Sequence, residues 1–504
     1  MRKRVMDKKE KHKQAHKALS PRGNRWGFYL ALVAMTAAFA VWTATQFPYT
    51  YMTMEGDDFW VLTRDFWQLK LATLPAVTQW LADFLMQFYG SPIVAANIEA
   101  LILGAIGLLA HAVLRRTFST SWLPWLALLP PLLLGYYCTF SLAFMLQWLF
   151  LFALLLAYQL IPLGDRAKLL WSLLCVPLGF FLMRTPMLTL LIVLQTLSEG
   201  KKLKAALGKG FAKAYPLWGG LAGAVLLVFA PLVYSQQVAF IPFGERYTSF
   251  GTYFDPLTSR YNANGEFIKK MAHLASEGRW EDLLYREHAK SEARRGNSVA
   301  LRYALLAESA LGTLPENLLD YPIREEDQFL YPHETEYVAL QFNRLFYLNL
   351  GIYDEAYHHA QEYGQLQPGG ICFSSLRQMV DYSIEEGDFE VSEKFLNILA
   401  RSSRHKSFIE SRRKKLSDRR SSGQPGKQVS LRADNFVGGY PLPIEMLRLA
   451  RYYGEGPGQK KMLDYAICSY LLRNDKESFI VAIQAFGIYK NKKLPRAYQE
   501  YLDR

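Results

Sequence analysis

The chain has long apolar runs in its first half and apolar residues at helical spacing in its second half. Residues 26–235 contain about seven apolar runs, and the first one covers Trp26 to Phe47. A helix of roughly 20 residues crosses the hydrocarbon core of a bilayer. From about residue 260 apolar side chains recur every three or four positions, which is typical of amphipathic helices. The pattern predicts an all-α protein, with a polytopic helical membrane domain followed by a helical domain.

The later candidate spans are roughly 92–114, 121–137, 140–162, 169–183, 186–198 and 216–234. Segment 169–198 has two interpretations, because it could be one long helix or a hairpin that turns at Arg184. We prefer the hairpin, which gives about seven spans and keeps the basic segments described next on one side of the membrane.

The net charge of +13 is concentrated in the membrane half. Residues 1–25 carry ten Lys and Arg against two acids, and residues 26–235 carry twelve against eight, which leaves about +1 for 236–504. This distribution is a signal of membrane topology and not of nucleic-acid binding, so we expect no nucleic-acid partner. A local exception is segment 401–427, with ten basic residues and two acids. It is either a solvated helix end or a contact for anionic lipid or polysaccharide.

Basic segments follow the second, fourth and sixth predicted spans, at Arg115-Arg116, at 164–168 and at 201–213. Lys and Arg accumulate in cytoplasmic loops. The N-terminus is therefore expected in the cytoplasm. Seven crossings then place the loop 48–91 and the C-terminal domain on the extracytoplasmic side.

The second half contains a weak repeat. The turns "GRW", "GTL", "GIY" and "GDF" begin at residues 278, 312, 351 and 387. The unit "LFYLNLGIYDEAYHHAQEYGQLQP" resembles a tetratricopeptide repeat, with the motif residues Tyr347, Gly351, Tyr353, Ala356 and Pro368. Glycine permits a tight turn between helices, alanine permits their close approach, and proline ends the second helix. The resemblance implies a domain that binds a protein or a peptide.

We therefore expect five regions: a basic leader, a transmembrane domain, tetratricopeptide-like repeats, a linker and a final helical pair. Their predicted bounds are 1–25, 26–235 with outer loop 48–91, 236–415, 416–445 and 446–504. Cys372 and Cys468 could pair in an oxidising compartment, but unpaired buried thiols are the preferred interpretation.

The layout and the ending "KLPRAYQEYLDR" resemble an uncharacterised family of bacterial polytopic envelope proteins with helical-repeat tails. That resemblance implies a place in the bacterial cytoplasmic membrane and a role in cell-envelope organisation, with the lipid bilayer as one partner. It implies no activity.

The stretch "MEGDDFW", residues 54–60, supplies the candidate chemistry through Glu55, Asp57 and Asp58. An acidic pair in the first outer loop resembles the GT-C class of membrane glycosyltransferases, which use a polyprenyl-phosphate sugar donor. The resemblance implies that these residues act as catalytic base or as ligands of Mg²⁺ or Mn²⁺; otherwise the cofactor is unknown. The alternative is a solvated loop, or an N-cap for a helix over 58–70.

Glu99 and Arg184 complete the hypothetical site. Both lie within predicted membrane segments, where charged side chains are costly and usually face a cavity or a partner. Arg184 could hold a lipid phosphate through its guanidinium, or could pair with Glu99 or snorkel to the interface. The preferred prediction is a multipass protein that presents an extracytoplasmic interaction domain. The alternative is a GT-C-like glycosyltransferase, so whether the protein is an enzyme stays open.

Overall fold

A computed structural model describes residues 23–71, 75–118, 122–136, 142–160, 165–199, 215–238, 263–324, 328–329, 337–367, 370–402, 404–423, 443–453, 457–490 and 493–503. Within these ranges the chain is helical and contains no strand, as the apolar pattern predicts. It divides into two compact units. We call Met1–Pro48 with Thr63–Asn262 the membrane unit, and Tyr49–Leu62 with Ala263–Arg504 the repeat unit.

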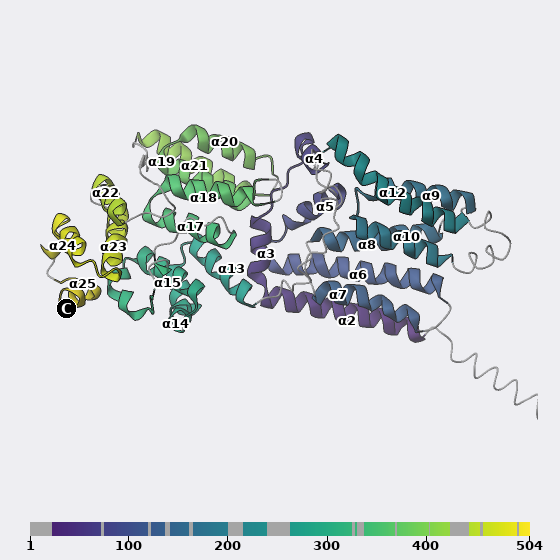
Figure 1. The fold of residues 1–504 in the computed structure, drawn as a ribbon, viewed down its shortest axis with the longest axis horizontal. Coiled ribbons are helices and arrows are strands. Elements are labelled where there is room, and N and C mark those ends of the chain that lie inside the picture. Colours follow the sequence, from purple (N-terminus) through teal and green to yellow (C-terminus); the bar gives the residue numbers. More distant parts are fainter. Residues whose placement is uncertain are drawn as a thin grey trace, which may run out of the picture. The chain divides into compact units, whose positions relative to one another are not determined.

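The membrane unit is a bundle in which α6 packs against α2 and α8, and α12 packs against α9 and α10 (Figure 1). Its helices are α2 (Gly23–Gln46), α4 (Arg64–Leu71), α5 (Ala76–Met86), α6 (Pro92–Thr117), η1 (Leu123–Leu128), α7 (Leu129–Tyr136), α8 (Leu142–Leu160), α9 (Asp165–Gly179), α10 (Thr185–Ser198) and α12 (Tyr215–Val238).

Among the described residues, three helices are long and apolar enough to cross a membrane: Trp26–Gln46, Pro92–Thr117 and Leu142–Leu160. Four shorter apolar helices coincide with the other predicted runs. The interpretation of 169–198 as one continuous helix is wrong, because α9 ends at Gly179 and α10 begins at Thr185. Pro186 lies in the first turn of α10, where proline is favoured because no hydrogen bond is lost there.

The repeat unit contains most of α3 (Pro48–Gly56) and the helices that follow residue 262. These are α13 (Ala263–Ser276), η5 (Asp282–Arg286), α14 (Ala289–Arg294), α15 (Ser298–Leu311), α16 (Leu314–Asn317), η6 (Leu318–Asp320), α17 (Tyr337–Leu350), α18 (Tyr353–Gln365), α19 (Phe373–Glu386), α20 (Phe389–Leu399), α21 (Lys406–Ser422), α22 (Pro443–Tyr453), α23 (Pro457–Leu472), α24 (Lys476–Ala485), η8 (Ile488–Lys490) and α25 (Arg496–Leu502).

The predicted turn glycines end helices in this unit. Gly278, Gly312, Gly351 and Gly387 have φ values of 70°, 73°, 78° and 85°. This left-handed conformation suits glycine because it has no Cβ. α17 and α18 pack together, as do α19 and α20.

The segment 345–368, which carries the clearest repeat pattern, contains the end of α17, the turn at Gly351 and α18. Tyr347 and Tyr353 are buried, and Ala356 is completely buried. Pro368 lies outside the described residues. The final helical pair is also present as α23 and α24, with Asn474 at φ 56° in the turn between them. Cys372 and Cys468 are free thiols.

Two boundaries differ from the predicted regions. The outer loop 48–91 contains three helices, α3, α4 and α5, and its first part belongs to the repeat unit. The linker 416–445 begins within α21, which continues to Ser422, and α22 begins at Pro443. Residues 424–442 of that linker lie outside the described ranges.

Candidate functional site

The segment Tyr49–Leu62, which contains the acidic residues, is held at its start by a carboxylate of α13. Glu266 accepts hydrogen bonds from the backbone N–H groups of Tyr49, at 2.6 Å, and Thr50, at 2.9 Å. It also accepts one from the Thr50 hydroxyl, at 2.6 Å. The first amides of a helix have no partner within the helix, and a negative charge there is favourable. Glu266 therefore caps α3 from another element of the repeat unit.

Asp57 is bound by the helices of the repeat. Its Oδ1 accepts a short hydrogen bond from the hydroxyl of Tyr363, a completely buried residue of α18. The guanidinium of Arg344 lies 4.0 Å from the centre of the Tyr363 ring and donates to Ser374 Oγ at 3.1 Å. Arg344 is only 4% exposed. Asp57 is thus joined to a buried cluster of tyrosine and arginine.

The next residues continue this packing. The backbone carbonyl of Asp58 accepts a hydrogen bond of 3.0 Å from the backbone N–H of Phe373, the first residue of α19. Phe59, Trp60 and Val61 are all buried. Buried aromatic side chains contribute a large apolar area to an interface. The segment is therefore a packed part of the repeat unit and not a loop in bulk water.

Glu55 and His405 are close, but they do not form an ion pair. Glu55 Oε1 lies 4.0 Å from His405 Nε2, and His405 stacks on Phe373 with 3.4 Å between ring centres. Burial raises the pKa of Glu55 to about 7, against the opposing effect of Arg404 and Arg377. Burial, together with the same two arginines, lowers the pKa of His405 to about 4. At no pH are both side chains mainly charged, and between about pH 4 and pH 7 both are mainly neutral.

The other two predicted site residues lie in the membrane unit. Glu99 is completely buried in α6 and accepts a hydrogen bond of 3.1 Å from the Tyr89 hydroxyl. Arg184 is half-buried before α10, and its backbone N–H donates to Gln147 Oε1 at 3.0 Å. Glu55, Asp57 and Asp58 therefore lie together in one unit, and Glu99 and Arg184 lie in the other. Neither aspartate caps the helix predicted over 58–70, because α4 begins at Arg64.

One buried ion pair was not predicted from the sequence. Lys70 of α4 pairs with Asp83 of α5, and their side chains are 5% and 7% exposed. The signal that could have found it is a single aspartate in an otherwise apolar stretch, Ala76–Met86. Arg344 was also missed, and it too is a lone charge in an apolar helix. In the ranges that the structure describes, no three His, Cys, Asp or Glu side chains gather as metal ligands.

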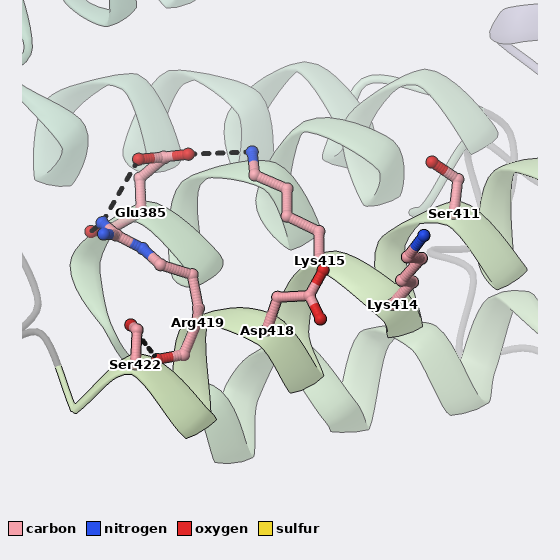
Figure 2. A pocket seen from close by; sticks show the side chains of 7 residues that line it. All are labelled: Glu385, Ser411, Lys414, Lys415, Asp418, Arg419 and Ser422. Carbon is pink, nitrogen blue, oxygen red and sulfur yellow. Dashed lines mark hydrogen bonds and ion pairs between the residues drawn. The ribbon is translucent and has the colours of Figure 1, made fainter.

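A second candidate surface lies on α21. A shallow hollow of about 530 Å³ is lined by Glu385 of α19 and by six residues of α21: Ser411, Lys414, Lys415, Asp418, Arg419 and Ser422. Figure 2 shows Lys415 and Arg419 both turned toward Glu385, at 2.8 and 3.5 Å. Lys414 and Ser411 lie away from that carboxylate. Two of the three cations that line the hollow thus pair with Glu385, and Asp418 lines it as a second carboxylate.

Residues 24–502 match the model of a family of unknown function, DUF6057. No curated protein and no solved structure matches the chain. This agrees with the expected membership of an uncharacterised family. Because the match extends over almost the whole sequence, the chain belongs to the family of unknown function DUF6057.

Proposed function

We propose that this chain is a multipass protein of the bacterial cytoplasmic membrane that presents a helical-repeat interaction domain on the outer side. The three long apolar helices and the four shorter ones support the membrane location. The basic leader and the three basic segments support a cytoplasmic N-terminus and about seven crossings. A role in envelope organisation would follow from the display of a binding domain at the membrane surface.

The repeat unit supports the interaction role through its resemblance to tetratricopeptide repeats. The glycines at positive φ and the buried Ala356 occupy the positions that such repeats use for turns and close helix packing. Domains of this kind stack helical pairs and bind proteins or peptides on the resulting surface. We therefore propose a protein or peptide partner for this unit.

One observation favours the interaction role over catalysis: the Asp57 carboxylate is engaged by α18 of the repeat unit. Tyr363 donates to the Asp57 carboxylate, and the first amide of α19 donates to the Asp58 carbonyl. A catalytic base must instead reach the proton of a substrate hydroxyl. We propose that the acidic segment fixes the repeat unit to the chain just after α2, the first predicted span.

The alternative function, a GT-C-like glycosyltransferase, would use the same carboxylates as base or as ligands of Mg²⁺ or Mn²⁺. It would also need Arg184 and Glu99 near the lipid phosphate. The two functions differ in what Asp57→Asn should do. Asparagine keeps an oxygen that accepts from Tyr363, but it cannot act as a base.

The test combines topology with this substitution. A periplasmic reporter fused after Gln237 should be active, and one fused at Gly208 should be inactive. The Asp57→Asn variant should support wild-type growth and envelope composition in a strain that lacks the chromosomal copy. Removing the repeat unit should abolish complementation. A cytoplasmic tail would contradict the proposed topology, and loss of an envelope glycan in the folded Asp57→Asn variant would favour the enzyme.

A further inference from the structure

The basic helix α21 has two faces that differ in how their charges are matched. On the inward face Arg412 pairs with Asp381, while Lys415 and Arg419 pair with Glu385. The apolar residues of the helix, Ile409 and Leu416, are buried, and Phe408 is half-buried under the Arg412 guanidinium. The acids of α19 therefore neutralise the inward cations, and Figure 2 shows this for Lys415 and Arg419. The apolar side of α21 is used within the fold.

The cations on the outward face do not form such ion pairs within the described part of the chain. Lys406, Arg413 and Lys414 are exposed, and in the described part of the chain none of them forms an ion pair with a carboxylate. Arg413 donates only to the neutral amide of Asn397, at 3.1 Å. Lys406 and Arg413 are two helical turns apart, a separation of about 10 Å along the axis. Glu410 and Asp418 are the exposed acids of this face, so its three cations exceed its carboxylates by one.

The composition of this face restricts the partner. Its other exposed side chains include the hydroxyls of Ser407, Ser411 and Ser417, and it exposes no large apolar residue. Helices that insert into a membrane interface use aromatic or aliphatic anchors, and so do the energetic centres of protein interfaces. A ligand of this face must be recognised through charge and hydrogen bonding alone. A linear polymer that combines carboxylates with hydroxyl groups meets both requirements.

We infer that the outward face of α21 binds an acidic polysaccharide through Lys406, Arg413 and Lys414. The cations would meet successive carboxylates along the polymer, and the serine hydroxyls would bond to sugar hydroxyls. The inference deepens the proposed function, since only an extracytoplasmic repeat unit would meet such a polymer. The inferred binding site does not depend on the membrane topology, so an experiment can contradict the binding inference and the proposed topology separately.

The test uses the full-length protein in nanodiscs of neutral lipid. Polygalacturonate, a linear polyuronate, is titrated at low and moderate salt, and affinity is measured by a fluorescence titration. The variant Lys406→Gln/Arg413→Gln/Lys414→Gln should bind about 10- to 100-fold more weakly, because each surface cation near a polyanion contributes roughly a factor of five. The matched control Arg448→Gln/Lys476→Gln/Lys493→Gln removes three exposed cations elsewhere in the repeat unit and should bind like the wild type.

The inference is overturned by unchanged binding of the α21 variant, by an equal loss in the control variant, or by equal affinity for duplex DNA at matched charge concentration. Binding to phosphatidylglycerol vesicles without binding to polygalacturonate would also overturn it and would assign the face to lipid. Unchanged melting temperatures of both variants establish that any loss reflects the binding face. A cytoplasmic result from the topology reporters would overturn the proposed location while leaving the measured binding intact.

Discussion

The membrane unit and the repeat unit bury charge in different ways. In the membrane unit Lys70 and Asp83 form an ion pair between two neighbouring helices. In the repeat unit Glu308, which is completely buried, accepts from Thr313, from Asn317 at 2.7 Å, from Tyr321 at 2.8 Å and from Lys290 at 3.3 Å. In an ion pair each buried charge is compensated by one partner. In a network of several donors the buried carboxylate keeps most of its hydrogen bonds when one donor is removed. The comparison teaches that equally buried charges need not be equally sensitive to mutation.

The largest effect is expected when the pair in the membrane unit is broken. Asp83→Ala leaves the Lys70 ammonium buried without its carboxylate and should destabilise this unit by about 3–5 kcal/mol. The double variant Lys70→Met/Asp83→Leu replaces the pair with apolar groups of similar size and should recover most of that loss. Unfolding in mixed micelles by increasing SDS measures both. Equal destabilisation of the single and double variants would contradict the ion-pair explanation.

The next largest effect is expected for the pH dependence of the stability of the repeat unit. Because burial raises the pKa of Glu55 to about 7, the folded state favours the protonated acid. This stabilisation is complete below about pH 4.5 and is lost as the pH rises through 7. Glu55→Gln should therefore stabilise the repeat unit at pH 8 by roughly 2 kcal/mol, after allowance for partial exposure, and should change little at pH 4.

The contribution of His405 to the pH dependence of stability has the opposite sign. Its lowered pKa, about 4, means that its contribution is present above pH 6.5 and is lost as the pH falls toward 4. Thermal unfolding at pH 4, 6 and 8 separates the two residues. The exposed carboxylate Glu410 provides the control, since Glu410→Gln should not alter the pH profile. If the Glu55→Gln variant keeps the pH dependence of stability seen in the wild type, Glu55 is not the source of that dependence.

A packing change in the repeat unit should cost about 1–3 kcal/mol. Ala356 has no exposed surface in α18, which packs on α17. Ala356→Leu adds volume that this close interface cannot accept without shifts of the backbone. Chemical denaturation followed by circular dichroism at 222 nm measures the loss. Ser407→Leu on the exposed face of α21 is the control, and a similar loss there would contradict the packing explanation.

The smallest effect tests the redundancy of the Glu308 network. Tyr321→Phe removes one of its donors but leaves the other three, so we expect a loss of about 1 kcal/mol. Asn317→Ala should have a similar effect, and the double variant should lose more than the sum of the two single variants. The same denaturation experiment applies. A loss from Tyr321→Phe as large as that from Asp83→Ala would end the distinction between the two units.

The structural features that could be predicted from the sequence are those set by residues close to one another in the chain. The apolar runs revealed the helices of the membrane unit, and Gly351 and Gly387 marked turns because left-handed backbone favours glycine. The environment of Asp57 could not be predicted in this way. Its partner Tyr363 is 306 residues away, and no local period reports a contact over that distance. For the same reason no local pattern indicates that Glu266, in the first turn of α13, caps α3.

The separation of Tyr49–Leu62 from its partners has a consequence for synthesis of the protein. A ribosome adds about 5–20 residues per second, so the 306 residues between Asp57 and Tyr363 take roughly 15–60 s. Throughout that interval Phe59, Trp60 and Val61 have been made, but α18 and α19, which bind the segment that contains them, are not complete. These side chains must therefore be kept from aggregating while the apolar helices insert into the membrane. The contacts of this early segment with α18 and α19 can therefore form only late in synthesis.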